Sequence, residues 1–138
     1  MPPPVTAYLH YDAAENIMYV TFPVVHLETA AQIKDHFDRV IASWKAQCKG
    51  RKAYWVVDYD HFTVNLREND SYAQHMKRVS ETCAVTIVRY GGDSLQRAAV
   101  RLYNMKLHEP SRIYASKEEA LGVVRALKKG DMTLQDGK

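Results

Sequence analysis

The chain has 138 residues, of which 46% are hydrophobic and 25% are charged, and this balance is that of one ordinary globular domain. The composition predicts an ordered chain except at its ends, and no apolar run approaches the length of a membrane span. The formal net charge of +3 is mildly basic and lacks the clustered basic face typical of nucleic-acid binding, so no nucleic-acid partner is expected.

The beginning of the chain and its cysteines bear on location. Residues 1–4, Met-Pro-Pro-Pro, lack the basic and then apolar pattern of a signal peptide, which favours a cytoplasmic location. Cys48 and Cys83 form no Cys-x-x-Cys pair, so two free thiols are expected. We expect a single domain over residues 1–138, with flexible ends at residues 1–4 and 131–138.

The first predicted elements are a β-hairpin and a long helix. Residues 5–11 alternate weakly, and residues 17–22 are rich in β-branched and aromatic side chains. Pro23 ends the second strand. Over residues 28–46, apolar side chains recur at helical spacing and predict an amphipathic helix. These side chains are Ala30, Ile33, Phe37, Val40, Ile41 and Trp44.

Buried strands alternate with helices in the middle of the chain. Residues 53–58 and 84–89 are short, almost continuous apolar runs, typical of strands buried on both faces of a sheet. A helix over residues 68–82 is predicted between them. After the Gly91–Gly92 turn, Asp93 or Ser94 is expected to cap a further helix. Its predicted inner stripe consists of Leu95, Ala98, Ala99, Leu102 and Met105.

The last predicted elements are a short strand and a helix. Pro110 separates the preceding helix from a strand over residues 112–115. Ser116 and Glu119 have the spacing of a capping box, and Gly130 ends the helix that they begin. The element order is therefore ββαβαβαβα. It predicts an α/β fold with a mixed, mostly parallel sheet and right-handed crossovers.

This order of elements over residues 5–129 resembles the STAS fold, in particular its SpoIIAA-like branch. The resemblance depends on the opening hairpin, on the helix that ends near Trp44, and on three segments. These are Tyr54-Trp55-Val56-Val57-Asp58, Arg89-Tyr90-Gly91 and Ile113-Tyr114-Ala115-Ser116-Lys117-Glu118-Glu119-Ala120. The resemblance implies a non-enzymatic regulatory or binding module without a cofactor, which docks a protein or senses a small ligand.

The resemblance also implies a place to look for a phosphorylated serine. In members that antagonise anti-sigma factors, this serine begins the helix after the central strand. Asp58 matches the acid that ends that strand, but residues 66–71 do not reproduce the serine motif. Ser71 is the nearest serine, and no glycine follows it. The usual phosphoserine switch is therefore not expected.

Ligands of parallel α/β sheets bind beyond the carboxyl ends of the strands, and two predicted loops lie there. The candidate residues for binding a ligand or partner are Asp58, Tyr59, Asp60, His61 and Phe62 in the first loop, and Arg89, Tyr90, Gly91, Gly92 and Ser94 in the second.

Each loop has a chemical and a structural interpretation. Asp58 and Asp60 are oxygen ligands that suit Mg²⁺, and Asp-x-Asp after an apolar strand resembles phosphatases of the haloacid dehalogenase type. The favoured alternative is that these acids cap turns. The Gly91–Gly92 turn before a helix could hold an anion, with help from Arg89 and Arg97. An ordinary turn is favoured, because Asp93 brings a negative charge.

Three functions remain open from the sequence. The leading hypothesis is the regulatory or binding module, with a protein partner or a small apolar or anionic ligand. The second is a small-molecule or lipid carrier with a pocket lined by Tyr59, Phe62 and Tyr90. The third is a small metal-assisted hydrolase that uses Asp58 and Asp60. The six histidines show no ligand spacing, so no metal site is predicted. The edge of the opening hairpin is a possible surface for a homodimer.

Overall fold

A five-stranded sheet with strand order β1-β2-β4-β6-β7 organises the computed structural model, which describes residues 4–107 and 112–134. β1 pairs antiparallel with β2, and every other neighbouring pair is parallel. The predicted mixed, mostly parallel α/β fold is therefore confirmed. The strands are β1 (Tyr8–Asp12), β2 (Ile17–Thr21), β4 (Ala53–Asp58), β6 (Ala84–Tyr90) and β7 (Ile113–Tyr114).

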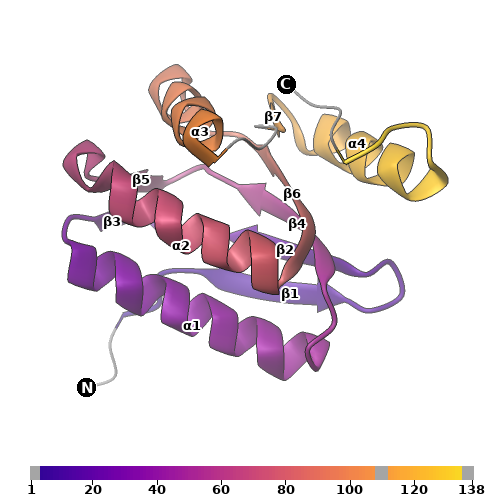
Figure 1. Cartoon of the computed structure of the whole chain (residues 1–138), viewed down its shortest axis with the longest axis horizontal. Coiled ribbons are helices and arrows are strands. Elements are labelled where there is room, and N and C mark those ends of the chain that lie inside the picture. The colour runs from indigo at the N-terminus through magenta and orange to yellow at the C-terminus, as the bar shows by residue number, and fades with distance from the viewer. Residues whose placement is uncertain (1–3, 108–111, 135–138) are drawn as a thin grey trace.

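Helices cover both faces of this sheet unequally. They are α1 (Ala30–Cys48), α2 (Asn69–Thr82), α3 (Ser94–Leu107) and α4 (Lys117–Lys129). Figure 1 shows α1 and α2 side by side across one face, where they enclose the main core. On the other face α4 packs Ala120 and Val124 against Val56 and Val88. None of the helices in the described part of the chain is long and apolar enough to cross a membrane.

Local sequence explains where the helices begin and end. Thr29 and Gln32 form a capping box at the start of α1, because each side chain accepts a hydrogen bond from the other residue's backbone N–H. Ser116 caps α4 by accepting from the N–H of Glu119 at 3.2 Å, which confirms the predicted cap, whereas the Glu119 carboxylate accepts from the Ser116 hydroxyl at 3.4 Å in place of the reciprocal backbone bond of a capping box. Gly130 ends α4 in the left-handed conformation.

A second, two-stranded sheet is absent from the sequence prediction. β3 (Val25–Leu27) pairs in parallel with β5 (Phe62–Val64), and a 3₁₀ turn (Leu66–Glu68) connects β5 to α2. β2 and β4 are parallel neighbours in the main sheet. β3 follows β2 after Pro23, and β5 follows β4 after residues 59–61, so the small sheet extends the same parallel pairing. It positions the first candidate loop against the carboxyl end of the main sheet.

The predicted inner stripe of α3 is wrong. Leu95, Leu102 and Met105 are 67%, 53% and 71% exposed, whereas Val100 and Asn104 are buried. The rotation of the helix is set by the Gln96 amide, which donates to the backbone carbonyls of Phe62 and Tyr59. Because Gln96, Val100 and Asn104 share one face at a spacing of four residues, that face packs inward.

The remaining predictions concern thiols and chain ends. Cys48 and Cys83 are both free and buried, which confirms the expected thiols. Arg112 donates to the carbonyls of Thr133 and Leu134, which attaches this part of the C-terminal segment to the domain. Pro110 and residues 1–3 and 135–138 lie outside the described residues.

Candidate functional site

The two candidate loops lie against each other, because β4 and β6 are neighbouring parallel strands. Tyr59 donates its backbone N–H to the carbonyl of Tyr90 at 2.9 Å. Asp60 Oδ1 accepts from the N–H of Gly92 at 2.9 Å, and Asp58 Oδ1 accepts from the N–H of Asp60 at the same distance. Both carboxylates therefore hold backbone in place, and that of Asp60 joins the two loops.

Burial and mutual interaction set the electrostatics of this junction. Burial raises the pKa of Asp58, the N–H of Asp60 opposes that shift, and the nearby Asp60 charge adds to it. Burial, together with the charge and hydrogen bond of Asp58, raises the pKa of Tyr90 to about 12. The phenol therefore stays protonated and donates to Asp58 at neutral pH. In the described part of the chain, no three His, Cys, Asp or Glu side chains converge as metal ligands.

Gly91 is required by the way the loops meet. Its φ of +76° lies in the left-handed region, and a Cβ at this position would stand 2.8 Å from Asp58 Oδ1 and 3.0 Å from Asp60 Oδ1. A side chain would therefore separate the two loops.

The helix that follows has little capacity left for an anion. Asp93, not Ser94, caps α3: its carboxylate accepts from the N–H of Gln96 at 2.8 Å, and Gln96 Oε1 accepts from the N–H of Asp93 at 2.7 Å. Arg97 donates to the carbonyl of Gly92 at 2.9 Å. Ser94 is exposed in the first turn. The N–H groups of Gly92, Asp93 and Gln96 are thus already bonded within the protein, and the Asp93 carboxylate opposes an anion at this helix start.

The other candidate side chains separate onto different surfaces. Tyr59 and Phe62 are buried in an aromatic cluster of the main core, whereas Tyr90 lies on the α4 side of the sheet. Arg89 is 2% exposed and therefore inaccessible to a ligand in this conformation. His61 is exposed, with a φ of +69°. The three aromatic residues predicted to line the pocket of a carrier therefore do not share one pocket. Tyr59 and Phe62 line a cavity that Tyr90 does not reach.

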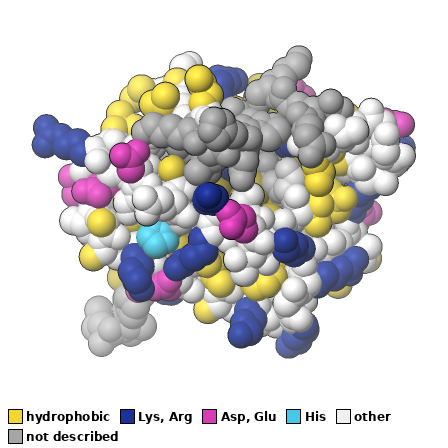
Figure 2. Space-filling model, in the orientation of Figure 1, with side chains coloured by type: hydrophobic (Ala, Val, Ile, Leu, Met, Phe, Trp, Pro, Cys, Tyr) yellow, Lys and Arg dark blue, Asp and Glu magenta, His cyan; other side chains and the backbone are white. Residues whose placement is uncertain are grey.

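That cavity, here called the α3 groove, has a volume of about 150 Å³ and lies between β5, the start of α2 and α3. Exposed Leu66 and Leu95 stand among its lining residues, and hydrophobic side chains gather over α3 in Figure 2. The lining consists of Tyr59, Phe62, Thr63, Val64, Asn65, Leu66, Asn69, Tyr72, Leu95, Gln96, Ala99 and Val100. Sequence reasoning missed this groove, because it placed Leu95 and Ala99 inside the core.

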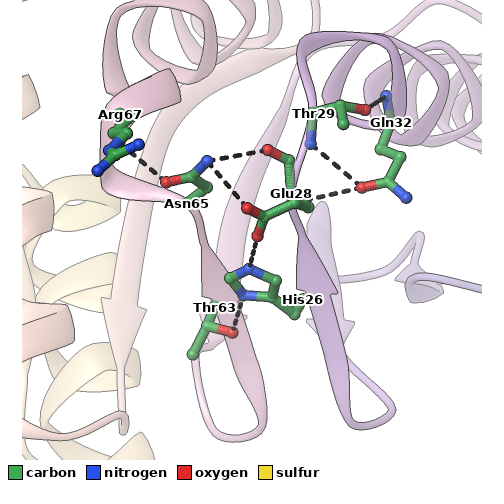
Figure 3. Close-up of polar contacts among 7 residues, drawn as sticks. All are labelled: His26, Glu28, Thr29, Gln32, Thr63, Asn65 and Arg67. Carbon is green, nitrogen blue, oxygen red and sulfur yellow. Dashed lines mark hydrogen bonds and ion pairs between the residues drawn. The ribbon is translucent and has the colours of Figure 1, made fainter.

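A polar network on the small sheet was missed as well (Figure 3). His26 lies between the Thr63 hydroxyl, at 2.8 Å from Nδ1, and the Glu28 carboxylate, at 2.5 Å from Nε2. Asn65 donates to the backbone carbonyl and the carboxylate of Glu28 at 3.1 and 3.2 Å. The network ties β3 to β5 and to the start of α1. His26 and Glu28 are 50% and 60% exposed, so it clamps the small sheet from the solvent side.

Comparison with known proteins gives the fold a name. No protein-family model matches the chain, and no curated protein matches its sequence. The structure is similar to SLC26A9, with a TM-score of 0.56 and 8% identity over 84% of this chain, which spans 21% of that protein. It is also similar to an uncharacterised protein of the DUF3478 family from Shewanella loihica PV-4, with a TM-score of 0.52 and 16% identity over 90% of this chain and 98% of the other. The latter is described as SpoIIAA-like. Identities this low establish the fold alone, and the chain accordingly has the SpoIIAA-like fold that its sequence predicts.

Proposed function

We propose that this chain is a non-enzymatic binding module of STAS type that docks a partner protein at the α3 groove. One observation carries the proposal: apolar side chains cluster in solvent beside a recess. Leu66, Leu95, Leu102 and Met105 are four of the eight exposed large hydrophobic side chains among the described residues. A clustered apolar surface on a folded domain marks an interaction site, whereas scattered single residues do not.

The size of the groove supports docking over carriage of a small molecule. Its volume of about 150 Å³ equals roughly five water molecules at about 30 Å³ each. Pockets for small molecules usually hold about 300–1,000 Å³. A recess of the smaller size suits one large apolar side chain inserted by a protein partner.

The candidate acids support a binding role over hydrolysis. Asp60 accepts a backbone hydrogen bond from Gly92 that joins the two loops, and Asp58 accepts one from Asp60 within its own loop, so both carboxylates stabilise the ends of the strands. A cytoplasmic location is part of the proposal. The free, buried Cys48 and Cys83 suit a reducing compartment.

The experiment places a photo-cross-linking amino acid at position 66 or 95 in living cells, with position 5 as the control. Val5 is 54% exposed and lies outside the groove. We expect the groove positions to capture one protein that position 5 does not, and Ala99→Trp, which fills the groove, to abolish the capture.

Binding of that protein, once purified, is then measured by calorimetry. Leu95→Asp should weaken it at least about tenfold, since hot-spot side chains contribute more than about 1.4 kcal/mol, and Val5→Asp should not. Equal capture from all three positions would contradict the proposal. A retained small molecule in native mass spectrometry would favour the carrier instead.

A further inference from the structure

The solvent-facing side of α3 carries the spacing of a coiled-coil seam. Leu95, Ala98, Leu102 and Met105 follow one another at intervals of three, four and three residues, and all four are exposed. This is the a/d pattern of a heptad repeat, in which each side chain packs between those of a facing helix. The opposite side of α3 carries the buried Val100 and Asn104. The helix thus has one face in the core and a short apolar seam in solvent.

We infer that this seam, here called the α3 seam, docks an acidic amphipathic α-helix of a partner protein. The inference rests on the proposed function and specifies the partner's chemistry. Two helices packed through such a seam cross at about 20°, and apolar residues at matching positions of the second helix would cover Leu95, Leu102 and Met105.

The charges of α3 indicate an acidic partner. Its charged residues are Arg97, Arg101 and Lys106, and the segment Ser94–Leu107 contains no acid. Arg101 precedes Leu102 and therefore occupies a position that flanks the seam. Flanking positions of a coiled coil pair with opposite charges on the facing helix.

Arg101 is available for such a pair. It is exposed, and no ion pair or side-chain hydrogen bond occupies it within the described residues. Arg97 differs, because its guanidinium is bonded to the carbonyl of Gly92. Across the groove, exposed Leu66 is followed by exposed Arg67, whose side chain is likewise unoccupied within the described residues.

The acids near the groove lie at the starts of the helices: Asp93 caps α3 by accepting from the N–H of Gln96, and two further acids begin α2. Glu68 is half-buried at the N-cap of α2, and Asp70 lies in its first turn, where negative charge complements the helix dipole. Asp70 has an interaction of its own. Within the described residues, the charge that flanks the middle of the α3 seam is that of Arg101 and is positive.

The same features argue against two other occupants. A second copy of α3 would bring the positive charges of one helix against those of the other, and like charges across a seam are unfavourable. A lipid surface would contact the exposed leucines, but it is flat and cannot fill a recess of about 150 Å³ beside them. A helix can lie on the seam and insert one side chain into the groove.

The test uses two designed peptides of about three heptads with Leu at the a and d positions. One carries Glu at the flanking positions and its twin carries Lys, so repulsion between like charges keeps each peptide monomeric at neutral pH. Binding to the full chain is followed by fluorescence anisotropy. We expect the Glu peptide to bind at least about tenfold more tightly than the Lys peptide, with the difference shrinking at high salt.

Substitutions assign the binding to the α3 seam. Arg101→Glu combined with Lys106→Glu should reverse the preference between the peptides, whereas Arg125→Glu on α4 should preserve it. Leu102→Asp should abolish binding of both peptides. Circular dichroism of each variant verifies that the fold is retained.

Each contrary result has its own meaning. Equal affinity for the two peptides would overturn the acidic partner but not the docking function. Failure of both peptides, while the cross-linker at position 66 still captures a protein, would overturn the helical partner alone. Failure of both experiments would overturn the proposed function. Binding to phosphatidylserine vesicles without peptide binding, or self-association that Leu102→Asp abolishes, would overturn the inference in favour of a membrane or a second copy.

Discussion

At the scale of single residues, Gly91 lets the two candidate loops lie in contact because it has no side chain. Gly91→Ala would force alanine into a left-handed φ of +76° and place its Cβ 2.8 Å from Asp58 Oδ1. Strain of this kind costs about 1–3 kcal/mol. We expect the free energy of unfolding to fall by that amount in urea titrations.

Gly122 provides a matched control for this substitution. It lies exposed within α4, and an added Cβ would meet no atom within 4 Å. Gly122→Ala should therefore stabilise the protein by about 0.5–1 kcal/mol, since alanine favours a helix interior over glycine. Destabilisation of the same size by both substitutions would contradict the role given to Gly91.

At the scale of elements, β1 is an edge strand whose free side is occupied by a side chain of α1. Gln47 Oε1 accepts from the N–H of Tyr11, and Gln47 Nε2 donates to the carbonyl of Leu9, both at 3.0 Å. The amide thus bonds as a neighbouring strand would. Because exposed edges recruit strands of other chains, this amide guards β1 against pairing.

Gln47→Ala should therefore increase self-association. The substitution frees two backbone groups that point away from β2, and a second copy can pair with them. Sedimentation velocity over a concentration series should show more dimer than the unsubstituted chain. Gln74→Ala, at an exposed position on α2, is the control and should not change the distribution. Equal behaviour of the two variants would refute the guarding role.

The sequence predicts the long elements well because their signals are local. β4 has the predicted bounds, and α1, α2 and α4 differ by at most a few residues at their ends. β3 and β5 have three residues each, which is too short for an alternating pattern to be distinguished. The orientation of α3 depends on Gln96 contacting Phe62, a residue 34 positions earlier, and no local pattern reveals that.

The sequence predicts the junction of the two candidate loops but not the α3 groove. The rule that strands end at one edge of a parallel sheet brings Asp58 and Tyr90 together, as the structure shows. The groove depends on which face of α3 packs inward. The inward face of α3 carries the polar Gln96 and Asn104. A prediction that buries the apolar residues therefore places the α3 seam in the core, where it does not lie.

At the scale of the whole molecule, the buried imidazole of His36 on α1 contacts both the N-terminal segment and the aromatic side chains beside the small sheet. His36 is 2% exposed, and its Nδ1 lies 2.8 Å from the Thr6 hydroxyl. Phe22, Phe37 and Phe62 surround the ring. Burial, reinforced by the Arg39 charge and opposed by Asp35, lowers the pKa of His36 to about 4.

This buried imidazole should make the stability of the domain depend on pH. An unfolded histidine has a pKa of about 6.5. Between pH 6.5 and pH 4 the unfolded chain binds the proton and the folded chain does not, so stability rises with pH across this window. The contribution is complete above pH 6.5 and disappears as pH falls towards 4. The gap between the two pKa values corresponds to about 3 kcal/mol.

Denaturant titrations at a series of pH values isolate this contribution. His36→Gln keeps a polar amide near Thr6 but cannot titrate, so we expect most of the slope between pH 6.5 and pH 4 to vanish. Thr6→Val removes the hydroxyl at 2.8 Å and leaves the imidazole buried, so that variant should lose stability at every pH while keeping the slope. An unchanged slope in His36→Gln would show that the acid sensitivity of the domain originates in its carboxylates, because their protonation is the other route by which acid unfolds a protein.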